Sequence, residues 1–432
     1  MGNNVVEKKR VLVYPCGTEI GLEVYKALCF SKQYEVLGGT DSYDHGRFVF
    51  NKLIDNLPFI KDDSNEEDVI RFEKAIESYN IDFIYPAMDG VIAVFAKYRH
   101  AFKEVLIAPE TDTAEMCRSK KATYAFLKDV IDIPRLYSSA EEITSFPVFA
   151  KPDKGQGAVG ATKINNSDEL IKIDFDKYVV MEYLPGKEYT IDCFTNSDGR
   201  LVYARARGRK RIKNGISVNS VFDDSPAFFD IAYKINNVLK QKGGWFFQLK
   251  EADDGKLKLL EVAARIAGTS ALSRNIGANL PLLTVDIFNG VKVDDIVLNS
   301  CYIELDRALA NVYKTDITYS TVYMDYDDTI VKEGVINTLV IRFLYQCVNK
   351  GKKLVLLSKH DGDLEEELTH YRIKELFDEV IHLERAENKK DYVKDKDSIF
   401  IDDSYGERKA IKVSCNIPVF DTHMVECLLE ED

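Results

Sequence analysis

The sequence predicts a multidomain protein of mixed α/β and α+β class, and three observations lead to this prediction. Its 432 residues exceed the usual length of one domain. Near both ends of the chain, short apolar runs alternate with segments of helical spacing, which is typical of parallel sheets with crossover helices. Between these regions, glycine-rich loops mix with short strands and helices, as in an α+β domain. Hydrophobic residues, at 45%, are sufficient for several cores.

The first domain is expected over residues 1–115 and consists of βαβ units. Its apolar runs are short and end in turn signals such as Pro15–Gly17. The expected strands are Val11–Tyr14, Tyr34–Gly38 and Phe83–Tyr85, and the expected helices are Ile20–Leu28 and Glu66–Tyr79.

Two further domains are expected, joined by a polar, weakly periodic connection at 306–320. The middle domain, 116–305, begins with a helix at Lys120–Lys128 and a strand at Val148–Lys151. In the last domain, 321–432, strands and helices alternate again, which predicts a Rossmann-like sheet. Its expected elements are the strand Val322–Met324, the helix Val335–Asn349, and the strands Leu354–Leu357 and Ser398–Ile401.

Charge and composition exclude several classes of function. A formal net charge of -13 argues against a nucleic-acid-binding surface over the whole protein. No run of about 18 apolar residues occurs, and the N-terminus lacks the apolar stretch of a secretory signal. The eight cysteines form no CxxC pair, so neither a zinc ribbon nor a thioredoxin-like site is indicated. We expect a cytoplasmic protein with neither nucleic acid nor membrane as a partner.

The middle domain carries a candidate phosphate-binding segment. Lys151 ends a strand and is followed by a loop that contains Gly155, Gly157 and Gly160. Glycines let backbone N–H groups approach phosphate oxygens, and the lysine adds a positive charge. Glycine-rich turns are common, so this segment alone is equally compatible with an ordinary loop.

Three later segments give the loop a context. They are Val179–Tyr189 (VVMEYLPGKEY), Phe247–Lys250 (FQLK) and Leu260–Gly268 (LEVAARIAG). This order of motifs resembles the ATP-grasp superfamily, and the nearest pattern is the carbamoyl-phosphate synthetase large-subunit type. The resemblance covers about residues 10–295. It implies an ATP-grasp fold preceded by a Rossmann-like pre-ATP-grasp domain.

The resemblance also implies ATP and Mg²⁺ (or Mn²⁺) as cofactors. Lys120 and Lys151 would contact the phosphates of ATP, and the loop 155–160 would form a lid. Glu182 and Leu184 would form the adenine hinge. Glu188 would hold the ribose hydroxyls.

In the same resemblance, Gln248 and Glu261 match metal ligands, and Arg265 matches the arginine that steadies a transferring phosphoryl group. These are chemically suitable residues, because magnesium prefers oxygen ligands and phosphoryl transfer needs charge neutralisation. The family usually reads Glu-x-Asn-x-Arg, and here Ala263 stands where asparagine would bind the second metal. Three alternatives follow: the second metal relies on Glu261, ATP and water, another side chain replaces the asparagine, or the module binds nucleotide without activity.

The acceptor site is expected near the basic segment RARGRKRIKNG, which in this family lies close to the acid substrate. Arg205, Arg207, Arg211 and Lys213 are candidates to hold a carboxylate or phosphate. A solvated basic hairpin is an equally compatible interpretation of any one of them. The segment Gly17–Gly21 opens a helix and is a candidate contact for a substrate anion.

The last domain contains Asp325-Tyr326-Asp327-Asp328-Thr329 directly after a strand. A carboxylate at a strand end can attack phosphorus, and an acid two residues later can protonate the leaving oxygen. Further motifs follow in order: a strand ending in Ser358, then Lys389 or Lys390, and then a strand ending in Asp402 and Asp403. Together they resemble the haloacid dehalogenase (HAD) superfamily over 321–432.

This second resemblance implies a role for each residue. Asp325 would be the nucleophile, Asp327 the general acid, Ser358 a phosphate ligand, and Lys389 or Lys390 the cation beside the phosphate. The magnesium ligands would come from Asp325, Asp327, Asp402 and Asp403. Only 28 residues separate Thr329 from Ser358, too few for a large cap, so a capless HAD-like domain with an open site is expected.

The predicted function is ATP-dependent joining of a carboxylate to an amine through an acyl-phosphate, with a C-terminal hydrolase of phosphate monoesters that needs magnesium. The expected partners are a small-molecule carboxylate, an amine and a phosphate ester, and a homodimer is left open. The alternatives are a carboxylase or carbamoyl-phosphate-type enzyme, and a non-catalytic nucleotide-sensing or scaffold protein.

Overall fold

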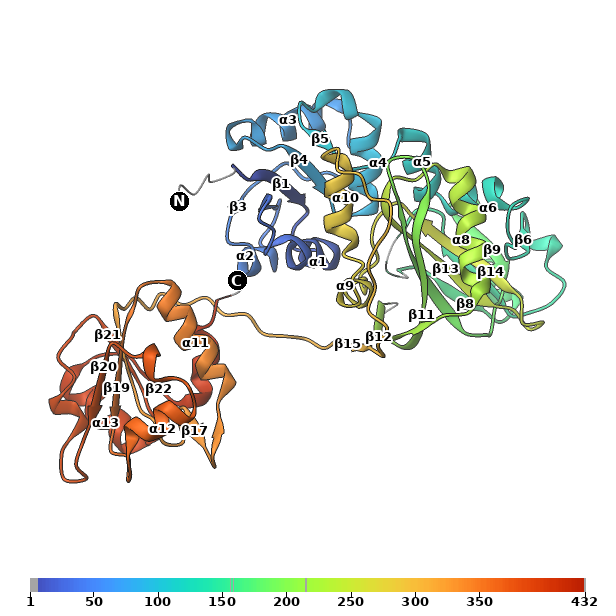
Figure 1. Cartoon of the computed structure of the whole chain (residues 1–432). Helices are drawn as coiled ribbons and strands as arrows, with labels where there is room; N and C mark the ends of the chain where they lie inside the picture. Colours follow the sequence, from blue (N-terminus) through green and yellow to red (C-terminus); the bar gives the residue numbers. More distant parts are fainter. Residues whose placement is uncertain (1–6, 156, 158, 214–215, 431–432) are drawn as a thin grey trace. The chain divides into compact units, whose positions relative to one another are not determined.

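The computed structural model describes residues 7–155, 157, 159–213 and 216–430. It divides into two compact units, Met1–Leu309 and Ala310–Asp432 (Figure 1). The division falls inside the connection expected at 306–320. Residues 307–319 contain neither helix nor strand.

The first unit begins with a five-stranded parallel sheet of order β3-β2-β1-β4-β5. Side chains of β1 alternate between its faces: Val11 and Val13 belong to one apolar core, and Leu12 and Tyr14 to another. The sheet is therefore covered on both sides, as a parallel sheet requires. The strands are β1 (Lys9–Tyr14), β2 (Tyr34–Gly39), β3 (Leu53–Ile54), β4 (Phe83–Pro86) and β5 (Val105–Leu106). The helices of this region are α1 (Glu19–Leu28), α2 (Gly46–Val49), α3 (Glu66–Ile76), α4 (Asp89–Lys97), α5 (Thr111–Arg118) and α6 (Lys120–Leu127).

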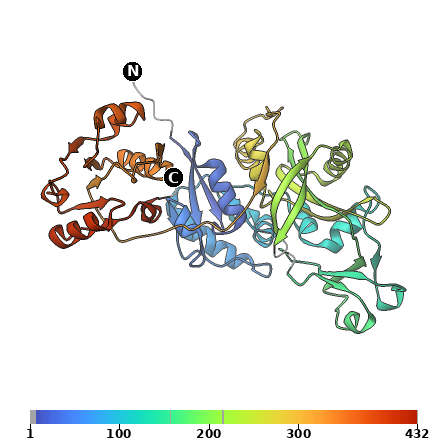
Figure 2. The ribbon, with the colours of Figure 1, turned by 90° about the horizontal axis from the view of Figure 1, so that it is seen from below.

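A segment from much later in the chain completes one face of this sheet. Helices α9 (Ala271–Asn275) and α10 (Leu280–Phe288) follow the middle strands, and Leu280 and Val285 share a core with Val11 and Val13. Figure 1 shows α10 beside the N-terminal strands, and Figure 2 gives the view from below. The N-terminal sheet is thus packed against the region that follows it.

The rest of this unit contains two antiparallel sheets. The larger has the order β14-β13-β10-β11-β12-β15, and α8 (Pro226–Leu239) packs on it; the smaller has the order β6-β9-β7-β8. The strands of the larger sheet are β10 (Glu188–Thr195), β11 (Leu201–Lys213), β12 (Ile216–Asp223), β13 (Gly243–Glu251), β14 (Leu257–Ala263) and β15 (Glu304–Asp306). The smaller sheet has β6 (Leu136–Tyr137), β7 (Val148–Pro152), β8 (Thr162–Ile164) and β9 (Tyr178–Glu182), with the short helix α7 (Ser167–Leu170) after β8.

The second unit is built on a five-stranded parallel sheet of order β20-β19-β16-β21-β22. The carboxyl ends of parallel strands meet at one edge, and this edge carries Asp325, Ser358 and Asp402. The strands are β16 (Thr321–Met324), β19 (Lys353–Ser358), β20 (Glu379–His382), β21 (Ser398–Ile401) and β22 (Val419–Phe420), with a hairpin of β17 (Val331–Lys332) and β18 (Val335–Ile336). The helices are α11 (Thr338–Asn349), α12 (Leu364–His370) and α13 (Tyr405–Cys415).

One predicted helix was wrong at its start. The helix expected over Val335–Asn349 begins at Thr338, because Val335–Ile336 pairs with β17 in a hairpin. Asn337 caps the helix: its side-chain oxygen accepts hydrogen bonds from the backbone N–H groups of Leu339 and Val340, at 3.1 and 3.4 Å.

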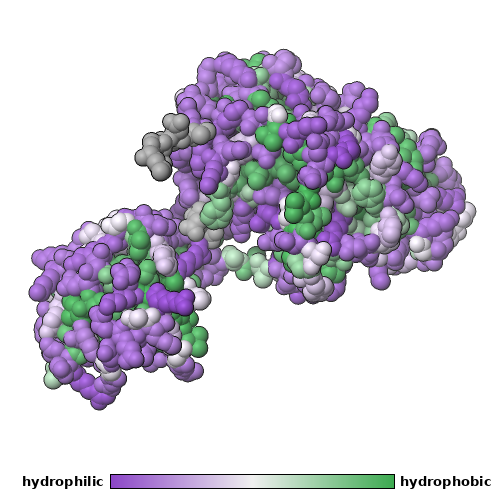
Figure 3. Space-filling view, in the orientation of Figure 1, coloured by the Kyte–Doolittle hydropathy of each residue, from purple (hydrophilic) through white to green (hydrophobic). Residues whose placement is uncertain are grey.

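The surface facing the viewer in Figure 3 is mostly hydrophilic, with apolar residues in smaller patches. Among the described residues, no helix combines the length and the apolar character needed to cross a bilayer.

Candidate functional site

Two adjoining cavities lie in the first unit. Cavity A, of about 240 Å³, lies between the starts of α1 and α4 and the larger antiparallel sheet. Cavity B, of about 200 Å³, lies between that sheet and β7 with its glycine loop. Gly157, Arg209, Gln248 and Glu261 line both cavities. The arrangement offers two neighbouring compartments with a common wall.

Two lysines from different elements converge on cavity B. Lys151, near the end of β7, is buried, and its Nζ lies 2.9 Å from the hydroxyl of Tyr124 and 2.6 Å from the carbonyl oxygen of Leu260. Lys120, the first residue of α6, lies 3.4 Å from the carbonyl oxygen of Gly155. Burial lowers the pKa of both lysines, that of Lys151 to about 7. A ligand with several negative charges would offset this cost of burial.

The glycine loop borders the same cavity. Gly155 and Gly157 line it, and Gly157 and Gly160 have positive φ angles of 63° and 77°, a conformation that favours glycine. The predicted lid also includes Gln156 and Ala158, which lie outside the described residues.

The predicted ribose contact lines cavity B, whereas the two predicted adenine contacts do not belong to its described lining. Glu188, at the start of β10, lines cavity B, where it forms an ion pair with Arg209 and lies 3.8 Å from Lys250. The Glu182 carboxylate, at the end of β9, instead accepts a hydrogen bond from Lys258 at 2.5 Å. Leu184 is buried. Neither Glu182 nor Leu184 is among the described residues that line cavity B.

The two predicted metal ligands are brought together by strand register. Gln248 on β13 is the cross-strand partner of Glu261 on β14, and both face the common wall of the cavities. An amide oxygen and a carboxylate are suitable donors for Mg²⁺, so the residues present fit this ion. The negative charge of Glu261 acts on four surrounding cations: Lys120, Lys151, Arg209 and Arg265.

The side chain of Arg265 is fixed by an acid of the N-terminal region. Its guanidinium forms two hydrogen bonds, at 2.8 and 2.7 Å, with Asp89, the first residue of α4. It also lies over the ring of Phe246, 5.3 Å from the ring centre. Sequence reasoning missed Asp89, because nothing local in its segment indicates a partner 176 residues away.

The basic strand β11 carries four predicted substrate contacts, and one of them, Arg207, lines cavity A. Its side chain is buried, with two hydrogen bonds to Asp192 at 2.8 and 2.9 Å. Arg205 instead forms an ion pair with Asp224, and Arg211 forms one with Asp306. Neither arginine is among the described residues that line the two cavities. The side chain of Lys213 lies outside the part of the chain that the structure describes. Sequence reasoning did not single out Arg209 and Arg307, which also line cavity A.

We expect nucleotide binding to be accompanied by proton uptake. At pH 8, Lys151 is mostly neutral in the free protein because its pKa is about 7, and nucleotide phosphates would raise that pKa. The affinity for ADP should therefore fall as the pH rises above 7. Calorimetric titrations with ADP in two buffers of different ionisation enthalpy should detect uptake of about one proton. Lys151→Met should remove this uptake, whereas equal heats in both buffers for the unmodified protein would contradict the prediction.

A second prediction concerns Ala263. It is paired with Phe246 across the strands and belongs to an apolar cluster of Phe246, Ala263 and Ala267. Because it offers no ligand, we expect a weak second metal site, and Ala263→Asn should lower the magnesium concentration for half-maximal activity several-fold. Ala267→Asn, which places the same amide in the same cluster, is the control. An unchanged magnesium titration in Ala263→Asn would refute the idea.

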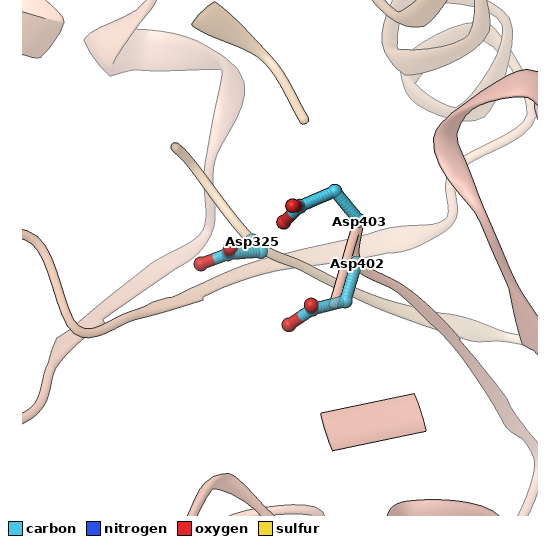
Figure 4. A group of neighbouring side chains, drawn as sticks. All are labelled: Asp325, Asp402 and Asp403. Carbon is cyan, nitrogen blue, oxygen red and sulfur yellow. The ribbon is translucent and has the colours of Figure 1, made fainter. Parts of the chain in front are cut away.

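The second unit gathers three acids at the edge of its sheet. Carboxylate oxygens of Asp325, Asp402 and Asp403 lie within 4.8 Å of one another, and the three side chains point to the same side (Figure 4). Burial and the charge of Asp325 raise the pKa of Asp402 and of Asp403. Such a cluster of oxygen donors fits a divalent cation.

A lysine lies directly beside these acids. The Nζ of Lys389 is 2.7 Å from Asp325 and 2.6 Å from Asp402, and this lysine is buried, whereas Lys390 is exposed. The geometry thus favours Lys389 over Lys390. Ser358, at the end of β19, is buried, and its hydroxyl has no hydrogen-bond partner among the described residues. A bound anion would supply one.

Asp327 lies apart from this cluster of acids. Its side chain is 52% exposed, and both carboxylate oxygens lie 3.0 Å from Nδ1 of His360. The carboxylate of Asp327 is not one of the three that converge on a common point. Its exposed position is compatible with the predicted role as a general acid, whereas the predicted role as a metal ligand receives no support from the geometry. Sequence reasoning missed His360, because a lone histidine after a strand carries no motif.

One family model matches a segment within the first unit. Residues 174–305 match a family model described as "ATP-grasp in the biosynthetic pathway with Ter operon". Biotin carboxylase from Campylobacter jejuni, in complex with βγ-ATP, superposes with a TM-score of 0.55 at 14% identity, over 68% of this chain and 74% of that one. The first unit has an ATP-grasp fold. N⁵-carboxyaminoimidazole synthetase from Staphylococcus aureus, complexed with ADP, gives a TM-score of 0.55 at 15% identity, over 68% of this chain and 81% of that one.

A sequence relative supports the ATP-grasp assignment over a shorter stretch. D-Alanine–D-alanine ligase from Thermotoga petrophila is 29% identical over 94 residues, which is 19% of this chain. The match spans about a third (31%) of that ligase. The ATP-grasp family match ends at residue 305, before the second unit begins.

Proposed function

We propose that the first unit is an ATP-dependent carboxylate–amine ligase. The observation that carries this proposal is the pair of cavities with Gln248 and Glu261 on their common wall. Cavity B, with Lys120 and Lys151, suits the phosphates of ATP. Cavity A, lined by arginines, suits the substrates. The γ-phosphoryl group and the carboxylate would thus meet beside Glu261.

In the proposed reaction, a carboxylate oxygen attacks the γ-phosphorus of ATP, giving an acyl-phosphate and ADP. The amine nitrogen then attacks the acyl carbon, phosphate leaves, and the nitrogen releases a proton as the amide forms. Lys120 and Lys151 would neutralise phosphate charge, and Arg265, fixed by Asp89, would steady the transferring group. Magnesium held by Gln248 and Glu261 would supply further charge neutralisation.

The relatives support this choice of cofactors and reaction. D-Alanine–D-alanine ligase joins two small molecules, by its name. Several structures with the same fold are complexes with nucleotides, and one of them, a 2-oxoglutarate carboxylase domain from Hydrogenobacter thermophilus, holds MgADP, ADP and bicarbonate. ATP and Mg²⁺ are therefore the proposed cofactors. Likeness to carboxylases keeps a bicarbonate-using enzyme as the second candidate.

We further propose that the second unit hydrolyses a phosphate monoester with the help of magnesium. Three observations support this function: the converging carboxylates of Asp325, Asp402 and Asp403, the buried Lys389 between two of them, and the hydroxyl of Ser358, which has no hydrogen-bond partner in the part of the chain that the structure describes. Asp325 would attack phosphorus and displace the alcohol, and water would then release phosphate. Asp327 would protonate the leaving oxygen.

A product screen tests the ligase proposal. The full chain is incubated with ATP and Mg²⁺ and a matrix of carboxylates and amines, and ADP, AMP, phosphate and pyrophosphate are measured. The expected result is ADP formation that requires one carboxylate and one amine together. ADP formation that requires only bicarbonate besides one acceptor would favour the carboxylase. Release of AMP and pyrophosphate would indicate an adenylate and refute the acyl-phosphate mechanism.

A further inference from the structure

Cavity A has a charged pair that the proposed phosphoryl-transfer step does not use. Glu19 is the first residue of α1, and Arg307 directly follows β15. Nη1 of Arg307 lies 3.3 Å from Oε2 of Glu19, although 288 residues separate them. The backbone of Arg307 is fixed by a hydrogen bond of 2.7 Å from its N–H to the carbonyl oxygen of Val218. Both ends of the pair are thus anchored in regular structure.

This pair differs from the other ion pairs of the cavity. Arg207 and Arg265 are each held by two hydrogen bonds of 2.7–2.9 Å to an acid that fixes them. In the described part of the chain, the Arg307 side chain has one hydrogen-bond partner, Glu19, at 3.3 Å. The two side chains remain 28% and 40% exposed. Because a guanidinium has five N–H donors, Arg307 keeps most of its capacity for a ligand.

Gly268 leaves space in front of this pair. A Cβ at this position would lie 2.6 Å from Oε2 of Glu19 and 3.4 Å from Nη1 of Arg307. Its φ angle does not lie in the left-handed region, so the backbone does not require glycine there. Gly268 also lines cavity A. The missing side chain therefore keeps both charges accessible from the cavity.

We propose that Glu19 and Arg307 select an amino acid as the amine substrate. A small molecule that carries both an ammonium and a carboxylate can exchange with the pair: its carboxylate binds Arg307 and its ammonium binds Glu19. A neighbouring pair of opposite charges binds such a zwitterion better than a ligand with one charge. The cavity volume of about 240 Å³ restricts the substrate to a small molecule. Binding involves no covalent change, and the ammonium loses its proton to water before the nitrogen attacks.

The inference rests on the proposed ligase function, and a binding experiment separates the two. The twenty standard amino acids are titrated one at a time into the full chain with ADP and Mg²⁺, in an isothermal calorimeter. Each amino acid that binds is compared with its decarboxylated amine and with the acid that lacks its amino group. We expect at least one amino acid to bind, with both analogues at least tenfold weaker.

Variants then locate the site. Arg307→Met and Glu19→Gln should each raise the Kd of the amino acid at least tenfold, and Gly268→Ala should act in the same direction by displacing Glu19. The matched control is Arg274→Met. Arg274 pairs with Glu23, one turn later on α1, at 2.8 Å, and neither residue is in the described lining of a cavity. This control should leave the Kd within about twofold.

Three outcomes would overturn the inference. They are the absence of binding by any of the twenty amino acids, equal binding of an amino acid and its analogues, and an equal loss of affinity in Arg274→Met. Gly268→Ala keeps both charged groups, so it provides an independent test of the site if Arg307→Met does not fold. If a carboxylate and a simple amine, but no amino acid, supported ADP formation, the ligase would stand and the inference would fail.

Discussion

Glu261→Ala is expected to lower substrate-dependent ADP formation by about 10²–10³-fold, a loss typical of removing one charge-stabilising group. Glu261 is the charged residue of the predicted metal pair and lies on the common wall of both cavities. Without it, magnesium would be bound more weakly, and the cations around it would lose their counter-charge. The measurement is kcat for ADP release at saturating ATP, repeated over a range of magnesium concentrations.

Two controls make this result specific. Glu261→Gln keeps the size of the side chain but removes its charge, and we expect it to lose nearly as much activity as Glu261→Ala. Glu67→Ala removes an exposed carboxylate from α3 and should change nothing measurable. If Glu261→Ala folded normally and kept more than about a third of the activity, Glu261 would not be a metal ligand of the reaction.

Asp325→Asn is expected to abolish hydrolysis of p-nitrophenyl phosphate by the full chain. Asp325 is the proposed nucleophile, and an amide oxygen is a far weaker nucleophile than a carboxylate. It also lies 2.7 Å from Lys389, so the substitution removes one of the charges that hold this lysine. Substrate-dependent ADP formation should remain largely intact, because Glu261 lies in the other compact unit. Glu261→Ala should show the opposite result: ADP formation should be lost and ester hydrolysis retained.

The control for this variant is Asp328→Asn. It makes the same chemical change three residues later, at an exposed position with a φ angle of 52°, which asparagine also tolerates. Hydrolysis should stay within a few-fold of the unmodified protein, which must itself first show measurable turnover. If Asp325→Asn also stopped ADP formation while folding was unchanged, the two sites would be coupled and the proposed separation would be wrong.

The local sequence was sufficient to predict strands and the residues that directly follow them, because these depend on residues that are close together in the chain. The apolar runs before Asp325 and Asp402 predicted two parallel strands, and residues after such strands meet at one edge of the sheet. The resemblance of the motifs around Gln248 and Glu261 predicted that both residues are metal ligands, and strand register places the two side chains opposite each other. The helix start at Thr338 was missed, because an apolar Val335–Ile336 fits either a helix or a short strand until its hairpin partner is known.

The tertiary structure decided which charged residues share a compartment. Sequence places Arg205, Arg207 and Arg211 in one basic strand, but packing buries Arg207 against Asp192 and leaves Arg205 and Arg211 to acids away from both cavities. Their neighbours come from other strands, and no local pattern encodes such a partner. The pairs Arg265–Asp89 and Arg307–Glu19 span 176 and 288 residues, so they form only when the later segments pack on the N-terminal sheet. The sequence by itself therefore determined the strands that precede the clustered acids of the second unit and the order of the motifs around Lys151 and Glu261, whereas long-range packing determined which charged side chains line cavity A.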